Sequence, residues 1–91
     1  MTRPAKTKAA VEHLRRVKAL PCGLCGAAAP SDAHHPRCFA GMGEKCSDWL
    51  VIPLCRLCHS NFHDGDRALW RIYKKDEPAI LAETIKVLLN G

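Results

Sequence analysis

The chain has 91 residues, six of which are Cys, and a formal net charge of +5 from 14 Lys and Arg against nine Asp and Glu. This length predicts one domain with a small core that needs a metal or disulfides as reinforcement. The 47% hydrophobic content excludes a disordered tail, and no apolar run approaches the roughly 18 residues of a membrane span.

Residues 1–20 are the basic end of the chain. They hold six bases and one acid, whereas residues 21–91 hold eight of each, so the whole formal excess lies in this first segment. Good helix formers with apolar residues at helical spacing predict a helix over residues 4–20, which Pro21 ends. We expect this basic helix, or arm, either to present an ordinary solvated face or to contact a polyanion through Arg15, Arg16 and Lys18.

The middle of the chain is rich in residues that form turns. Six Gly or Pro fall within residues 22–48, which predicts irregular loops that need an external organiser. Residues 49–54 form a short apolar run and are the best strand candidate in the chain.

Three helices are predicted after this strand. No Gly or Pro interrupts residues 55–63, and Gly65 would stop a helix there. Asp66 is placed to cap a second helix, over residues 66–74. A third helix over residues 76–90 carries an apolar stripe that we expect to lie in the core, formed by Ile80, Leu81, Ile85, Leu88 and Leu89.

Four of the six Cys lie in two Cys-x-x-Cys motifs that are 29 residues apart. A two-residue gap lets both thiolates of a motif face one ion, so the two motifs predict a tetrahedral structural zinc site. The basic N-terminus has no apolar stretch after it, so we expect a cytoplasmic, reducing location, where Cys pairs bind metals rather than form disulfides. The alternative, a pair of redox motifs, needs a strand–helix context of thioredoxin type that the chain lacks. The predicted zinc ligands are Cys22, Cys25, Cys55 and Cys58, whereas Cys38 and Cys46 are interpreted as free thiols, with a second metal as the alternative.

Four of the five His lie in or beside this framework. His59 and His63 are four residues apart, so on a helix they share one face and are suited to bind one metal ion. His34 and His35 are adjacent, so on a strand one can bind the ion while the other stays free. A neutral imidazole, with an ordinary pKa of about 6.5, suits a general base near neutral pH. The pattern predicts metal-assisted hydrolysis of a phosphodiester, with purely structural histidines as the alternative, and Asp64 as a candidate to orient a His.

The ordered set of motifs resembles the HNH, or ββα-metal, endonuclease family. It comprises the first Cys pair, the His34-His35 pair, and Pro-Leu-Cys-x-x-Cys-His at residues 53–59 followed by His63. The closer resemblance is to the phage and prophage branch of Ref-like, recombination-associated nucleases, through Gly-Met-Gly-x-Lys-x-Ser-Asp at residues 41–48 and a trailing helix that contains Trp. The resemblance implies a small α+β fold, in which a zinc-stapled ββα-metal core (the HNH or His-Me finger, within residues 21–91) is flanked by N- and C-terminal helices.

The resemblance also implies a role for each residue of the motifs. His35 would be the general base, and His34 would bind a catalytic divalent ion (Mg²⁺, Mn²⁺ or Zn²⁺) together with His59 and His63. Asp48 lies where the family places a polar residue, often Asn, that steadies the loop carrying the base. Three basic residues near the site in sequence are expected to contact phosphates, with an ordinary surface role for each as the alternative: Arg37, Lys45 and Arg56.

The chain is therefore predicted to be a hydrolase, a metal-dependent DNA endonuclease that nicks or cuts single- or double-stranded DNA with low sequence specificity. The resemblance further implies a phage or prophage origin and a recombination protein as a partner. A non-catalytic zinc module that binds nucleic acid or a protein is the competing interpretation. A cytoplasmic redox switch that uses Cys38 and Cys46 is the third.

Overall fold

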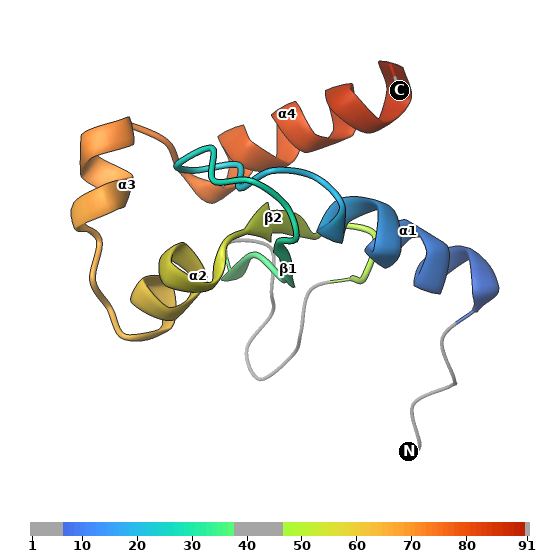
Figure 1. Cartoon of the computed structure of the whole chain (residues 1–91), viewed down its shortest axis with the longest axis horizontal. Helices are drawn as coiled ribbons and strands as arrows, with labels where there is room; N and C mark the ends of the chain where they lie inside the picture. The colour runs from blue at the N-terminus through green and yellow to red at the C-terminus, as the bar shows by residue number, and fades with distance from the viewer. Residues whose placement is uncertain (1–6, 38–46, 91) are drawn as a thin grey trace.

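The structure is a computed structural model that describes residues 7–37 and 47–90. Its elements follow the order helix α1, strands β1 and β2, and helices α2, α3 and α4. Figure 1 shows the two strands at the centre, with α1 to one side, α2 and α3 to the other, and α4 crossing above them. The described part of the chain therefore has the small α+β architecture that we expected, and it contains no helix long and apolar enough to cross a bilayer.

Helix α1 (Lys8–Lys18) confirms the predicted basic helix but is shorter than expected, since Thr7 and Ala19 already cap its two ends. The hydroxyl oxygen of Thr7 accepts a hydrogen bond of 3.1 Å from a backbone N–H one turn later, which caps the start of the helix. Leu14 and Val17 are buried on one face of α1 and pack against Val51 beside the sheet. An apolar face thus attaches the basic helix to the centre of the fold.

Strands β1 (Asp32–His34) and β2 (Ile52–Leu54) pair antiparallel, with His34 opposite Ile52. The sequence pattern did not reveal β1, because three residues within a loop-rich segment become a strand only through pairing with β2. The predicted strand over residues 49–54 is too long at its start. There the Ser47 carbonyl accepts a 3.0 Å hydrogen bond from the Leu50 N–H, and this turn precedes the strand.

The three predicted helices are present after β2. The Cys55 thiol caps α2 by accepting the N–H of Cys58 at 3.5 Å, so the second Cys motif also starts this helix. Asp76 caps α4 by accepting the N–H of Ala79 at 2.9 Å. The bounds are Arg56–His63 for α2, Ala68–Tyr73 for α3 and Glu77–Asn90 for α4.

The main core lies where the Cys motifs, β2 and the start of α4 meet. Gly23 donates a 2.8 Å hydrogen bond from its N–H to the carbonyl of Pro53. A Cβ at this glycine would lie 2.4 Å from a methyl group of Ile80, so the first Cys motif packs too closely for any side chain there. The buried members of this core are Cys22, Leu24, Ile52, Leu54, Cys58, Phe62, Trp70, Ile80 and Leu81.

The apolar stripe of α4 is only half buried, so the prediction that all of it lies in the core is wrong. Ile80 and Leu81 are 1% and 6% exposed, whereas Ile85 and Leu89 are 41% and 81% exposed. The physical reason is the length of α4: it runs past the short sheet, as Figure 1 shows. In its last turn, Leu88 packs against the α1 side of the core.

Candidate metal centres

The four predicted zinc ligands lie together in the structure. The Sγ atoms of Cys22, Cys25, Cys55 and Cys58 all lie within 4.8 Å of one another, and those of Cys25 and Cys55 are 3.7 Å apart. Sulfurs bound to one zinc at about 2.3 Å in a tetrahedron are separated by about 3.8 Å. The cluster therefore has the donor atoms and the spacing to hold a structural metal such as zinc.

Each Cys motif is a turn built around its first sulfur. Cys22 Sγ accepts the N–H of Cys25 at 3.4 Å, and Cys55 Sγ accepts the N–H of Cys58 at 3.5 Å. Gly26, at a φ of +79°, follows the first turn in the left-handed region that favours glycine. Because both turns use the same local bonding, two short sequence motifs are sufficient to aim four sulfurs at one point.

The thiols of this cluster differ in acidity. Burial raises the pKa of Cys22, but backbone N–H groups that include those of Cys25 and Leu24 outweigh it and lower this pKa to about 7. Burial, together with the neighbouring thiols of Cys55 and Cys25, raises the pKa of Cys58. Four thiolates repel one another at these distances, and a bound cation removes that repulsion.

A second group of ligand atoms lies between β1 and α2. Nitrogens of His34, His59 and His63 all lie within 4.8 Å of one another, and the two Nε2 atoms on α2 are 3.0 Å apart. Two imidazole nitrogens on one tetrahedral zinc are separated by about 3.4 Å. His34 is 2% exposed, whereas His63 lies at the surface, so this three-histidine cluster is open on one side.

Two of these histidines are hydrogen-bonded to carboxylates. Glu77 Oε2 lies 2.7 Å from His34 Nε2, and Asp32 Oδ2 lies 3.0 Å from His59 Nδ1. A metal-binding imidazole usually donates its other N–H to such a group, which sets its tautomer and orientation. The expected orienting residue, Asp64, instead caps the end of α2 and is exposed. In this arrangement His34 Nδ1 and His59 Nε2 remain for a metal.

Neither orienting carboxylate was recognised from the sequence. Glu77 is 43 residues from His34 and belongs to a different helix, so no local pattern connects them. Asp32 could have been predicted to lie near the histidines, because it is two residues before His34 on the same strand, and side chains two apart share a face. Glu77 is also buried, and it accepts the backbone N–H of Arg37 at 3.1 Å.

The electrostatics of the cluster favour neutral imidazoles. Burial lowers the pKa of His34 more than the Glu77 carboxylate raises it. Burial, together with electrostatic repulsion from His59 and Arg37 against a charged His63, lowers the pKa of His63. A neutral imidazole is the form that binds a metal, so both shifts keep the ligands available near neutral pH.

His35 lies beside this cluster without belonging to it. Its Nε2 is 2.7 Å from Asp48 Oδ1, and both side chains are about one-third exposed, at 30% and 27%. The His35 ring therefore contacts the turn that precedes β2, whereas the adjacent His34 belongs to the three-histidine cluster. The structure thus pairs the two residues to which the sequence assigned the base and its support.

The predicted phosphate contacts divide into two groups. Arg37 Nη2 lies 3.1 Å from His63 Nδ1, and Arg56 Nε lies 3.6 Å from Asp32 Oδ2, so both belong to the surroundings of the histidines.

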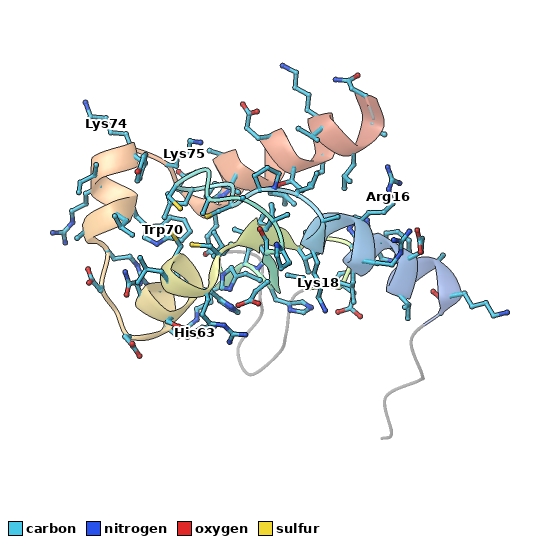
Figure 2. The ribbon with its side chains drawn as sticks, viewed as in Figure 1. Arg16, Lys18, His63, Trp70, Lys74 and Lys75 are labelled. Carbon is cyan, nitrogen blue, oxygen red and sulfur yellow. The ribbon has the colours of Figure 1, made fainter. Side chains whose placement is uncertain are left out.

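The bases of α1 lie across the sheet from His63, as Figure 2 shows for Arg16 and Lys18. Within α1, Arg15 bonds to Glu12, and Arg16 donates to the carbonyl of Leu88 at 3.1 Å. Lys45, the third predicted phosphate contact, lies outside the described residues, as do the two cysteines interpreted as free thiols, Cys38 and Cys46.

The fold and these clusters define a small α+β protein with a four-cysteine cluster that could hold a structural metal such as zinc. The model of a protein family described as "Protein of unknown function (DUF968)" matches residues 1–89, and the chain belongs to this family. The chain is also similar to the uncharacterized protein YdfU of Escherichia coli (strain K12), at 43% identity over 54 residues. These residues are 57% of this chain and only 15% of the relative. No solved structure matches the chain.

Proposed function

We propose that this chain is a metal-dependent endonuclease of the HNH, or ββα-metal, type that hydrolyses DNA phosphodiester bonds. The observation that carries the proposal is the His35–Asp48 pair, which directly follows a residue of the three-histidine cluster. A base held next to a metal-ligand set is the combination that such hydrolysis needs. The order of β1, β2 and α2, with ligands at the end of β1 and on α2, also supports this assignment.

The proposed catalytic ion would be held by His34, His59 and His63. When bound, such an ion polarises the phosphodiester and stabilises the charge on its leaving oxygen. Mg²⁺, Mn²⁺ and Zn²⁺ are the candidates, since an imidazole set accepts several divalent metals.

The proposed base is His35, and Asp48 determines which nitrogen acts. When Nε2 donates its hydrogen to the Asp48 carboxylate, Nδ1 carries the lone pair. Nδ1 then takes a proton from the attacking water, and the new positive charge on the ring is stabilised by the carboxylate 2.7 Å away. Asp48 is thus a positioning residue that acts through His35.

Arg37 is the proposed phosphate contact. Its guanidinium lies 3.1 Å from His63 Nδ1 and 5.3 Å from the centre of the Phe62 ring. If His63 binds an ion through Nε2, its proton stays on Nδ1, which can no longer accept a hydrogen bond from Arg37. The guanidinium is then free for the planar, two-bond contact that arginine makes with phosphate.

Low sequence specificity follows from the kind of contacts proposed. Arginines and the basic residues of α1 meet the phosphate backbone, which is the same for every sequence. Binding of DNA should therefore weaken steeply as salt is raised.

A plasmid-nicking assay tests the proposal. Purified chain is incubated with supercoiled plasmid and Mg²⁺, Mn²⁺ or Zn²⁺, beside the variants His35→Ala and Asp64→Asn. We expect the wild type and Asp64→Asn to nick, and His35→Ala to lose roughly 100- to 10,000-fold in rate with an unchanged zinc content. Failure of the wild type with every ion would contradict the proposal and favour the non-catalytic zinc module. Equal nicking by His35→Ala would contradict it as well.

A further inference from the structure

A half-exposed tryptophan follows Asp48, the partner of the proposed base, in the chain. Trp49 follows Asp48 in the turn before β2, and 50% of its surface is open to solvent. Its backbone N–H donates a 3.2 Å hydrogen bond to the hydroxyl of Ser47, which anchors the turn. The proposed nuclease chemistry assigns no task to this indole.

The indole is held from behind by His13 of α1. The two ring centres are 4.8 Å apart and the planes are tilted by 33°, within the separation at which aromatic rings attract each other. His13 Nε2 is buried and has no hydrogen-bond partner within the described residues, so the imidazole serves as a packing surface. The ring of Trp49 is therefore packed against His13 while half of the residue remains exposed.

The other tryptophan of the chain has a different role. Trp70 is 7% exposed and packs against Phe62 in the core, with ring centres 5.3 Å apart. Figure 2 shows Trp70 between α3 and the centre of the molecule. Since the chain has two Trp, one is a core residue and the other is an open aromatic surface beside the His35–Asp48 pair.

We propose that Trp49 is a stacking platform for an unpaired nucleobase next to the cleaved phosphate. Every base has a flat face, and stacking on an aromatic side chain is a general means of binding single strands. In an intact duplex both faces of a base are already stacked, so the platform selects DNA with unpaired bases. The preferred substrate class is therefore single-stranded DNA, or a junction that contains it. This inference rests on the proposed function, because it places the scissile phosphate at His35.

The helix behind the platform has the charge that a single strand needs. The described part of α1 contains one acidic residue and four basic residues, which are Lys8, Arg15, Arg16 and Lys18. Lys8 and Lys18 are exposed, and Glu12 is paired with Arg15. Positive side chains that follow the phosphates, together with aromatic rings that hold the bases, are the combination found in proteins that bind single strands.

Intrinsic fluorescence tests the stacking directly, because Trp70 is buried and Trp49 is not. The zinc-loaded His35→Ala protein is titrated, without added divalent ion, with an oligothymidylate of about 12 nucleotides and with a blunt duplex of the same length. We expect quenching by the single strand that is strong, saturable and absent from the Trp49→Phe variant. Equal quenching in the Trp49→Phe variant, or no quenching in its parent, would overturn the inference.

Affinity for the same labelled oligonucleotide supplies the second readout. Trp49→Leu should bind roughly 5- to 150-fold more weakly, whereas Trp49→Phe keeps an aromatic face and should lose less. Tyr73→Leu is the matched control, because Tyr73 is another exposed aromatic, on α3, and its loss should leave binding unchanged. Equal affinity for Trp49→Leu and the parent, with both folded by circular dichroism, would overturn the platform.

Binding and cleavage separate this inference from the proposed function. Nicking that depends on His35, without quenching by the oligonucleotide, overturns the platform and leaves the nuclease intact. Quenching without nicking by any ion overturns the nuclease, and with it the scissile phosphate beside the platform. Faster cleavage of single strands than of duplex, lost in Trp49→Leu, is the result expected when both hold.

Discussion

The cysteine and histidine clusters could each hold a metal ion, but they differ in their ligand atoms and in their surroundings. The cysteines belong to the core, where Cys22 and Cys58 are 4% and 0% exposed. The histidines begin in the core with His34, which is 2% exposed, and end at the surface with His63. Structural zinc sites are closed by four protein ligands, whereas catalytic sites keep a position open. Under the proposed function, the cysteine cluster maintains the fold and the histidine cluster meets the substrate.

The hydrogen bonds that position the ligand side chains also differ between the two clusters. The cysteine sulfurs accept backbone N–H groups from their own turns, so their positions depend on a few neighbouring residues. The histidines depend on carboxylates from other elements, Asp32 on β1 and Glu77 on α4. The cysteine cluster can therefore form as the two turns meet, but the histidine cluster requires the sheet and α4 to be in place.

The largest effect is expected from Cys22→Ser. Structural zinc contributes about 10–16 kcal/mol in small zinc domains, which is comparable to the whole stability of about 5–15 kcal/mol of an ordinary domain. We predict that the variant loses its zinc and its cooperative thermal transition, followed by metal analysis and circular dichroism. Cys38→Ser, which changes a cysteine outside the two motifs, is the control and should keep both. A folded, zinc-loaded Cys22→Ser protein would show that the cysteine cluster does not hold the fold together.

His59→Ala should impair the histidine cluster and leave the cysteine cluster intact. Mutation of a residue that hydrogen-bonds to a metal ligand typically lowers activity roughly 10- to 100-fold. Removal of one of the three histidines themselves should lower the nicking rate by more than this, while the zinc and the fold remain. Nicking rate, zinc content and melting temperature are measured together. Ser60→Ala, an exposed change on the same helix, is the control. If His59→Ala unfolds the chain as Cys22→Ser does, the histidines are structural and the contrast between the clusters fails.

Glu77→Gln tests the support behind the histidines. The amide keeps the shape of the side chain but loses the charge next to His34 Nε2, so we predict a roughly 10- to 100-fold weaker affinity for Mn²⁺. Isothermal titration of the zinc-loaded protein measures it. Glu83→Gln, an exposed change on the same helix, should bind Mn²⁺ as the wild type does. Identical affinities in the two variants would mean that Glu77 contributes only to packing.

The sequence predicted the cysteine cluster because its information is local. Each pair of ligands lies within four consecutive residues, and the turn geometry follows from the motif itself. The pairing of His59 with His63 was predictable for the same reason, since a helix brings residues four apart together. The addition of His34 depended on the pairing of β1 with β2, and Glu77 on a contact across 43 residues, which no local pattern contains.

The helices show the same limit. Gly65 predicted where α2 ends, because a glycine in the left-handed region stops a helix within one turn. Asp66 did not become the cap of α3, which starts after Arg67. The exposure of Ile85 and Leu89 was not predictable from periodicity, since an apolar stripe does not indicate how much partner surface faces it.

Arg37→Gln is expected to have the smallest effect, on the open side of the histidine cluster. Loss of one phosphate contact should weaken DNA binding several-fold for all sequences alike. It should also reduce the slope of log affinity against log salt concentration by about one, the equivalent of one released counterion. Arg71→Gln, an exposed arginine on α3, is the control. Binding isotherms over a series of salt concentrations measure both. An unchanged slope for Arg37→Gln would remove Arg37 from the proposed interface.

Metal content per chain tests the contrast between the two clusters most directly. The protein is dialysed against a mild chelator and analysed, then incubated with Mn²⁺, freed of excess metal and analysed again. We predict one zinc per chain after dialysis, and one zinc with one exchangeable manganese after incubation. His59→Ala should lose the manganese and retain the zinc. Two zincs that resist the chelator, or a chain that binds no manganese, would contradict it.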